Sequence, residues 1–203
     1  MGTLGGDGRH CVLETGVELA LIRHPRPATA SDVCVGQLDV ACAPGWQAHA
    51  DRLQRILAAP DRLVTSPLQR CRQLADRLGA VYRLAPELDP RLMELNFGAW
   101  EGRRWADIGR AESETWAADY FGSAPPGGES YSELLARVDG FLAGLGASFE
   151  RVVVISHASP LRALLVRCLG LAPEAGWRFD IGHGRLTRLA ERGGAWRLEV
   201  LNA

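Results

Sequence analysis

The sequence predicts an α/β protein, a three-layer α/β/α sandwich with a mainly parallel sheet. Short apolar runs that stop at turn residues alternate with segments of helical periodicity, which is the pattern of such sandwiches. Two of these runs, residues 17–22 and 152–155, have the character of buried strands, and each leads within two residues into a histidine, His24 or His157. In sheets of this kind, ligands bind outside the carboxyl ends of the strands. We therefore expect the two imidazoles to meet in one crevice.

Length, charge and cysteine content exclude several classes of protein. The 203 residues suit one domain, and 23 basic against 24 acidic residues argue against binding nucleic acid or membranes through bulk charge. No apolar run approaches the roughly 20 residues of a membrane-spanning helix. Residues 1–16 are Gly-rich and lack the hydrophobic centre of a signal peptide, so we expect a flexible tail before a domain at 17–203. Five cysteines without a CxxC pair favour a reduced, cytoplasmic protein.

The first half of the chain contains two strands and a helix in clear order. A turn-rich stretch at 25–44 follows the first strand, and Trp46, Ala50 and Leu53 then recur at helical spacing. The short run Arg62–Thr65 predicts the second strand.

Another helix is expected directly after this strand. Ser66 is its predicted N-cap, Pro67 takes its first position, and Gly79 suits its end. The apolar face of this helix comprises Leu68, Cys71, Leu74 and Leu78. Residues 81–84 predict a third strand.

The middle of the chain, at about 97–130, predicts a helical, lid-like insertion. It is rich in aromatic residues, among them Trp105 and Trp116, and it ends in a cluster of Pro and Gly. These aromatic side chains either line the pocket or fill a small core of their own. Ser130 and Glu133 form a capping-box pattern that opens the next helix.

The last third of the chain repeats this design. Ser159 and Pro160 predict the start of a helix after the second histidine. Residues 185–190 and 196–201 predict a closing hairpin around a Gly-Gly pair.

The residues at these strand ends resemble those of a known family, the histidine phosphatases of the phosphoglycerate mutase-like superfamily. The resemblance covers roughly residues 18–202 and rests on five motifs in the family's order. They are Leu21-Ile22-Arg23-His24, Gly36-Gln37-Leu38-Asp39 with the segment after it, Ser66-Pro67-Leu68-Gln69-Arg70-Cys71, the glutamate motif from Met93 to Gly102, and Ser156-His157. The resemblance implies a phosphoglycerate mutase-like fold. An Arg-His-Pro start joined to Gly-Gln-x-Asp looks most like the branch that includes α-ribazole phosphatases.

The chain also departs from the pattern of the family. Pro25 replaces the usual glycine, and Arg26-Pro27 replaces a common Glu-Thr pair. Ser31 and Asp32 lie near the place of a frequent asparagine. Ala158 replaces the glycine after the second histidine, and we keep it as a substrate-binding position.

Phosphoryl transfer gives each motif residue a role. A neutral imidazole at His24 can attack phosphorus and form a phosphohistidine. Arg23 and Arg70 supply planar forks that can hold the phosphoryl oxygens. His157 would balance the charge of the transferring group, and Glu94 would protonate the leaving oxygen and then deprotonate the attacking water. Because no His, Cys or acidic residues occur at metal-ligand spacing, we expect neither a metal nor another cofactor.

The sequence leaves the roles of several nearby residues open. Glu101 competes with Glu94 for the role of proton donor. Arg26, Arg162 and His183 either border the pocket or face solvent.

These observations predict a metal-independent phosphomonoesterase that acts on a small phosphorylated metabolite. The most specific expectation is α-ribazole 5′-phosphate, of cobalamin biosynthesis. The alternatives are a phosphoglycerate mutase-type phosphotransferase and a non-catalytic domain that binds a phosphorylated ligand. We expect no nucleic-acid or membrane partner, and a homodimer is one of the oligomeric states that the sequence leaves open.

Overall fold

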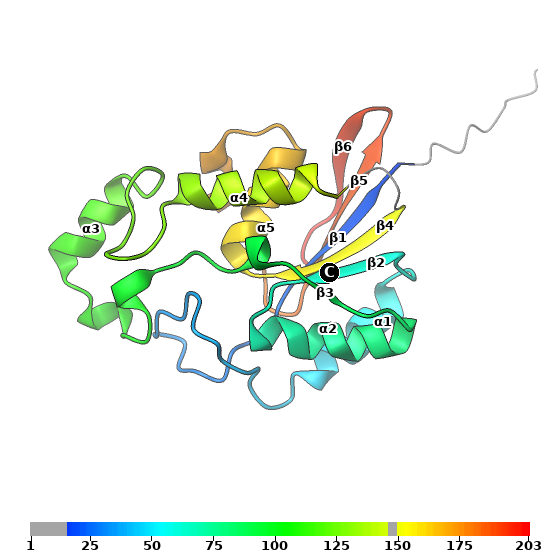
Figure 1. Cartoon of the computed structure of the whole chain (residues 1–203), viewed down its shortest axis with the longest axis horizontal. Coiled ribbons are helices and arrows are strands. Elements are labelled where there is room, and N and C mark those ends of the chain that lie inside the picture. The colour runs from blue at the N-terminus through cyan, green and yellow to red at the C-terminus, as the bar shows by residue number, and fades with distance from the viewer. Residues whose placement is uncertain (1–15, 146–149) are drawn as a thin grey trace, which may run out of the picture.

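A computed structural model of the protein describes residues 16–145 and 150–203, and its centre is a six-stranded sheet (Figure 1). The strands are β1 (Glu18–Arg23), β2 (Arg62–Thr65), β3 (Glu87–Leu88), β4 (Arg151–Ser156), β5 (Leu186–Arg192) and β6 (Ala195–Val200). Their order in the sheet is β3-β2-β4-β1-β5-β6. The first four run parallel, whereas β5 and β6 are antiparallel to their neighbours. The predicted fold class is therefore confirmed.

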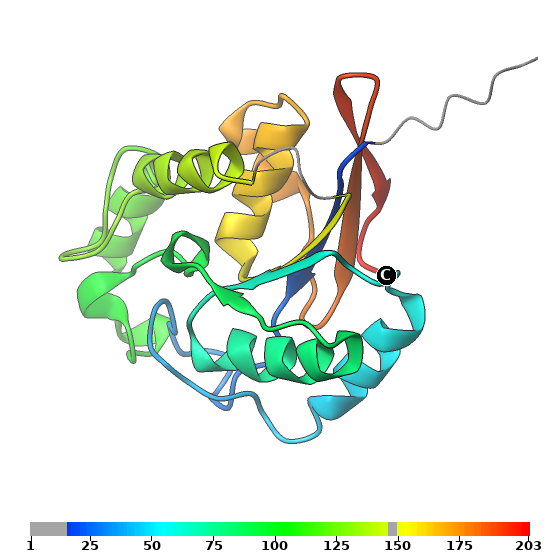
Figure 2. The ribbon, with the colours of Figure 1, turned by 45° about the vertical axis from the view of Figure 1, so that its right-hand side comes forward.

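Helices cover both faces of this sheet (Figures 1 and 2). They are α1 (Gln47–Ile56), α2 (Gln69–Tyr82), α3 (Arg110–Ala118), α4 (Tyr131–Ala143) and α5 (Ala158–Cys168). Helices α1 and α2 lie on one face, and α4 and α5 lie on the other. Since strand side chains alternate between faces, Ile22 and Ile155 pack in the core under α1 and α2, while Leu21 and Val154 pack in the core under α4 and α5.

The register of the two central strands brings the two histidines together. In the parallel pairing of β1 with β4, Arg23 lies opposite Ser156. The next residue, His24, donates its backbone N–H to the carbonyl of Ser156 at 3.0 Å. Both strands thus end at the same level of the sheet, and His24 and His157 follow them at that edge.

Helix α2 begins later than the sequence predicts. Its first residue is Gln69, and its N-cap residue is Leu68 instead of Ser66. The Ser66 hydroxyl does accept the backbone N–H of Leu68 at 3.4 Å, but it also lies 2.8 Å from Nε2 of His157. The prediction of a Ser66 cap was wrong because this hydroxyl belongs to the histidine site.

The predicted strand at 81–84 is also wrong. Helix α2 continues through Tyr82 and ends at Arg83, which takes the left-handed conformation at φ 57°. The edge strand is β3, three residues beyond the predicted run. Gly79 lies inside α2, where a Cβ would come within 2.5 Å of the carbonyl oxygen of Leu84, so glycine lets the chain turn back closely over the helix.

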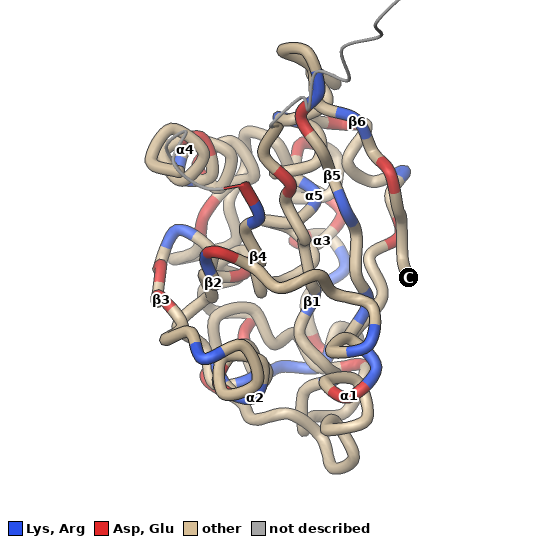
Figure 3. Tube along the Cα trace, turned by 90° about the vertical axis from the view of Figure 1, so that its right-hand side faces the viewer, with Lys and Arg blue, Asp and Glu red and all other residues tan. Residues whose placement is uncertain are grey.

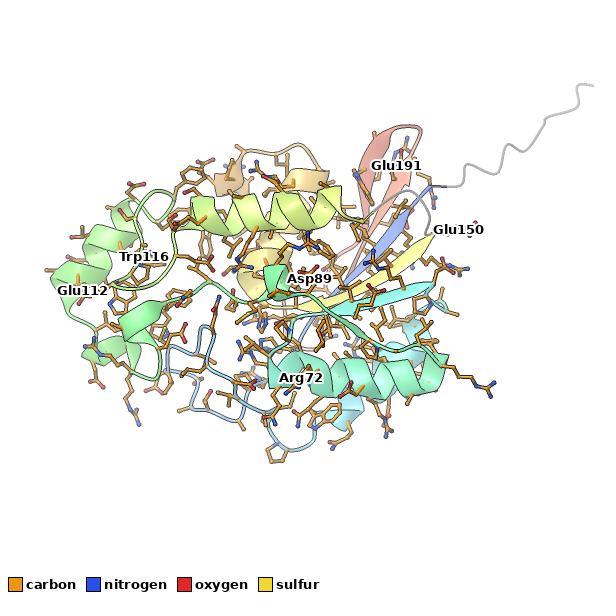
Figure 4. All side chains as sticks on the ribbon, viewed as in Figure 1. Arg72, Asp89, Glu112, Trp116, Glu150 and Glu191 are labelled. Carbon is orange, nitrogen blue, oxygen red and sulfur yellow. The ribbon has the colours of Figure 1, made fainter. Side chains whose placement is uncertain are left out.

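The segment 97–130 lies beyond one end of the sheet (Figure 1). It contains the 3₁₀ turns η2 (Gly98–Trp100) and η3 (Trp105–Asp107) and helix α3. Trp100 is 1% exposed and donates its indole N–H to Glu112 at 2.7 Å. Trp116, beside Glu112 in Figure 4, packs edge-on against Trp100. Trp100 and Trp116 thus form a small aromatic core of their own.

The rest of the chain follows the expected order. Strands β5 and β6 form the predicted closing hairpin. Of the expected tail at 1–16, residues 1–15 lie outside the described residues. In the described part, no helix has the length and apolar character to span a membrane. Basic and acidic positions are interspersed along the chain, and basic ones gather beside α1 (Figure 3).

Two helical glycines provide a matched test of the close packing at Gly79. We expect Gly79→Ala to lower the free energy of unfolding by about 1–3 kcal/mol, because the new Cβ meets backbone at 2.5 Å. At Gly140 in α4 the nearest heavy atom lies 4.0 Å from an added Cβ, so Gly140→Ala should raise stability by about 0.5–1 kcal/mol. Urea unfolding of both variants measures the difference, and equal effects would contradict the packing argument.

Candidate active site

His24 lies directly after β1 and is 4% exposed. Its Nδ1 lies 2.6 Å from the carbonyl oxygen of Pro25. Because a carbonyl can only accept, Nδ1 carries the proton and Nε2 keeps its lone pair. Burial, and then the charge of Arg70, holds the pKa of His24 well below its usual value. The imidazole is therefore neutral at pH 7, as a nucleophile requires.

His157 is fully buried beside His24, with 4.9 Å between the two ring centroids. It is the N-cap residue of α5, which begins at Ala158 and not, as the sequence predicts, at Pro160 after a Ser159 cap. Its Nε2 contacts the hydroxyl of Ser66 at 2.8 Å, whereas its buried Nδ1 has no hydrogen-bond partner among the described residues. Burial, and then Arg70, lowers the pKa of His157 well below its usual value.

The guanidinium of Arg70 is buried in the first turn of α2. It donates to the carbonyl oxygens of Leu38 at 2.7 Å and Gly36 at 2.6 Å, and its Nε points to Nε2 of His24 at 3.3 Å. Gly36 has φ +48°, and a Cβ there would collide with the carboxylate of Glu101. Among the described carboxylates, none forms an ion pair with Arg70.

Arg23 supplies a second cation at the same edge. Its Nη1 donates to the carbonyl oxygen of Ile181 at 2.6 Å, and its buried Nε has no partner in the described structure. The loop that carries Ile181 is tied by Asn202, whose amide accepts from Gly182 and donates to Asp180, each at 2.8 Å.

His183 lies in the same loop and borders the site. Its ring centroid is 5.1 Å from that of His24, and its Nδ1 is 3.1 Å from the carbonyl oxygen of His24. Burial, followed by the charge of Arg23, lowers the pKa of His183 to about 4.

Glu94 follows β3 and the turn after it, and it lines the cavity described below together with His24. One oxygen, Oε1, accepts the backbone N–H groups of Leu95 at 2.9 Å and of Ser159 at 3.1 Å. The second donor belongs to the first turn of α5. Glu101, its competitor, instead accepts the backbone N–H groups of Gln37 and Phe97 and holds loops together.

Most of these side chains line one end of a cavity of about 440 Å³, whereas His157, buried beside His24, is not among the lining residues. Arg23, His24, Arg70, Glu94 and His183 line the charged end. The rest of the lining is largely small or apolar, and it comprises Pro27, Thr29, Ala30, Ser31, Val33, Val35, Ala43, Phe97 and Trp105.

The predicted peripheral residues divide into two groups. Arg26 and Trp105 line the cavity, and Trp105 packs edge-on against Phe97 at 5.5 Å between centroids. Trp116, Arg162 and Ala158 are not among its lining residues.

Arg162 and Ala158 are occupied elsewhere. Arg162 donates Nε to the carbonyl oxygen of Phe179 and lies over the ring of Trp177, in the 3₁₀ turn η4 (Pro173–Arg178). Ala158 is buried as the first residue of α5.

The roles of three groups at the site could not be predicted from the sequence. The carbonyl groups of Gly36 and Leu38 orient Arg70, and backbone groups leave no signature of residue type. Ser66 carries a local signal, but that signal indicates a helix cap.

The arrangement suits an oxyanion. Neither the buried guanidinium of Arg70 nor the partly buried one of Arg23 has an ion-pair partner among the described carboxylates, and the unpartnered Nε of Arg23 and Nδ1 of His157 belong to residues of this site. A phosphoryl group would bring both the missing negative charge and the missing acceptors. Within residues 16–145 and 150–203, no group of three or more His, Cys, Asp or Glu could hold a metal ion.

Comparison with known proteins gives one consistent result. The family model of the histidine phosphatase superfamily (branch 1) matches residues 19–203. The adenosylcobalamin/α-ribazole phosphatase of Escherichia coli is 28% identical over 148 residues, which are 70% of this chain and 73% of that protein. The crystal structure of the α-ribazole phosphatase from Shigella flexneri superposes with a TM-score of 0.86 at 25% identity, over 92% of this chain and 96% of that one. The structure of mycobacterial glucosyl-3-phosphoglycerate phosphatase superposes with a TM-score of 0.82 at 26% identity, over 93% of this chain and 99% of that one.

The lowered pKa values predict how stability depends on pH. His24, His157 and His183 are neutral in the fold, and the pKa of an unfolded histidine is about 6.5. Below about pH 6.5 the unfolded chain therefore binds more protons, so the free energy of unfolding falls as the pH falls. We expect His183→Asn to reduce this slope between pH 6.5 and 4, measured by urea unfolding. An unchanged slope would show that His183 is not buried as a neutral group.

Proposed function

Because this chain belongs to the histidine phosphatase superfamily (branch 1) and is a phosphatase, we propose that it hydrolyses a small phosphomonoester through a phosphohistidine on His24. The residues that would do this are His24, Arg23, Arg70, His157 and Glu94, without a metal or other cofactor. The proposed partner is a small phosphorylated metabolite in the cytoplasm.

The observation that carries the proposal is buried positive charge without a described carboxylate partner, next to a neutral imidazole. Arg23 and Arg70 can take the phosphoryl oxygens in their planar forks. His157 is buried beside His24 and outside the cavity lining, and a phosphoryl group bound at His24 would have to reach its unpartnered Nδ1. These groups are fixed before the ligand arrives, which is what electrostatic stabilisation of a charged transition state requires.

In the first step, Nε2 of His24 forms a bond to phosphorus as the bond to the leaving oxygen breaks. Its proton on Nδ1 stays hydrogen-bonded to the carbonyl of Pro25, which stabilises the imidazolium that develops. Glu94 gives its proton to the leaving oxygen.

In the second step, water attacks the phosphohistidine. Glu94, now a carboxylate, takes the proton of that water, the bond from nitrogen to phosphorus breaks, and inorganic phosphate leaves. Both His24 and Glu94 return to their starting states.

For the substrate we propose α-ribazole 5′-phosphate, of cobalamin biosynthesis. Two sequence and structure relatives carry the name of α-ribazole phosphatases. The apolar lining beyond the charged end, with Trp105 edge-on to Phe97, suits the planar apolar base of such a substrate.

A second candidate substrate is a phosphomonoester that also carries a carboxylate. Arg26 is an exposed cation in the cavity lining, and no described carboxylate pairs with it. A structural neighbour is named a glucosyl-3-phosphoglycerate phosphatase. Arg26 could hold the second anion of a substrate of that kind.

Replacement of the nucleophile tests the mechanism. His24→Ala should lower kcat for p-nitrophenyl phosphate by about 10³-fold or more and remove acid-labile phosphoryl labelling. Circular dichroism would establish that the variant is folded. Turnover near the wild-type rate would exclude His24 as the nucleophile.

Two tryptophans test the substrate. Trp105→Ala should raise KM for α-ribazole 5′-phosphate about tenfold, since stacking contributes roughly 1–3 kcal/mol, and leave KM for p-nitrophenyl phosphate within about threefold. Trp116→Ala is the matched control, because Trp116 does not line the cavity and packs against Trp100 and Phe97, so its loss should affect both substrates alike.

Arg26→Met separates the two candidate substrates. It should leave α-ribazole 5′-phosphate turnover nearly unchanged. A large rise in KM for 3-phosphoglycerate, together with poor turnover of α-ribazole 5′-phosphate by the wild type, would favour the second candidate.

A further inference from the structure

Arg137, on helix α4, contacts both ends of the segment that carries Glu94. Its Nη1 donates to the carbonyl oxygen of Arg91 at 2.6 Å, and its Nη2 donates to the carbonyl oxygen of Glu94 at 3.1 Å. Arg91 lies in the 3₁₀ turn η1 (Pro90–Leu92). The guanidinium therefore bridges the backbone of a four-residue stretch, from Arg91 to Glu94.

Glu129 completes this contact from the other side. Its carboxylate accepts hydrogen bonds from Nη2 of Arg137 at 2.7 Å and from Nε at 3.1 Å, which makes the ion pair bidentate. Both side chains are largely buried, with 18% of Arg137 and 16% of Glu129 exposed. The same carboxylate accepts the backbone N–H of Asn96 at 2.9 Å, and the backbone N–H of Glu129 donates to the carbonyl of Asn96 at 2.9 Å.

Residues 94–97 belong to no helix or strand. Their backbone groups therefore need partners from elsewhere in the chain. Arg137 and Gln37, whose Nε2 donates at 2.9 Å, both bind the carbonyl oxygen of Glu94. The Arg137–Glu129 pair thus supplies, on both sides of Glu94, hydrogen-bond partners that a helix or strand would otherwise provide.

We infer that Arg137, paired with Glu129, is a positioning residue that fixes the main chain of Glu94 so that its carboxyl group meets the leaving oxygen. This inference rests on the proposed role of Glu94 as proton donor. Neither Arg137 nor Glu129 lines the cavity, so neither touches the substrate.

The inference has a kinetic signature. A displaced Glu94 protonates the leaving oxygen less well. This matters greatly for an alkoxide leaving group and little for p-nitrophenolate, which leaves without a proton. A residue that only stabilises the fold would affect both substrates alike.

The experiment compares Arg137→Met, Arg137→Lys and Glu129→Gln on p-nitrophenyl phosphate and on an alkyl phosphate such as β-glycerol phosphate. We expect Arg137→Met to lower kcat about tenfold or more on the alkyl phosphate and less than about threefold on p-nitrophenyl phosphate. Arg137→Lys should restore part of the loss, since a lysine keeps the charge without the planar fork. Glu129→Gln should show the same leaving-group dependence in weaker form.

Arg167→Met is the matched control. Arg167, on α5, forms a 2.8 Å ion pair with Asp139 of α4, away from Glu94, so its loss should leave the ratio of the two substrates unchanged. Equal losses on both substrates in the Arg137 and Glu129 variants would overturn the inference. If Arg137→Met does not fold, Arg137→Lys and Glu129→Gln decide the question by the same ratio.

Glu94→Gln separates this inference from the proposed mechanism. If it loses the alkyl phosphate selectively and the Arg137 variants do not, the positioning role is wrong and the mechanism stands. If Glu94→Gln shows no leaving-group dependence, Glu94 is not the proton donor, and the inference falls with the mechanism.

Discussion

The site depends on a guanidinium buried without a described carboxylate partner. Arg70 is held by carbonyl groups of the loop after β1, and carbonyl dipoles neutralise a full charge only in part. Two consequences follow from this one constraint. Together with burial, which is the larger cause, the charge lowers the pKa of the neighbouring imidazoles of His24 and His157, and it leaves the cavity ready for an anion. Glycine suits position 36 of the same loop, because a larger residue would be strained at φ +48° and its Cβ would collide with the carboxylate of Glu101.

Different parts of the fold supply the charged end of the cavity and the rest of its lining. His24, Arg70 and His157 stand at the end of a central strand or the start of a helix, where neighbouring backbone fixes them. The wall beyond them comes from residues 27–43 and from the excursion that contains Trp105. The groups proposed for phosphoryl transfer thus lie on rigid elements, whereas loops form the wall that would contact the rest of the substrate. Such an arrangement allows related proteins to accept different substrates without a change in the phosphoryl-transfer residues.

The sequence could predict the central strands and the residues that follow them, since buried parallel strands are short apolar runs and the two histidines stand directly beyond. Local rules failed where long-range contacts override them. Ser66 has the residue type and spacing of a helix cap, yet its hydroxyl serves His157. Residues 81–84 have a strand-like composition, yet helix α2 continues through Tyr82. Arg137 could not be recognised at all, because its partners are backbone carbonyl groups 43 and 46 positions away.

The unpaired positive charge at the charged end also bears on product release. Inorganic phosphate presents the same kind of oxygens as the phosphoryl group of a substrate, so under the proposed mechanism Arg23 and Arg70 would also hold the product. An enzyme built in this way is slowed by its own product, and its rate in the cell would follow the concentration of free phosphate as well as that of the ester.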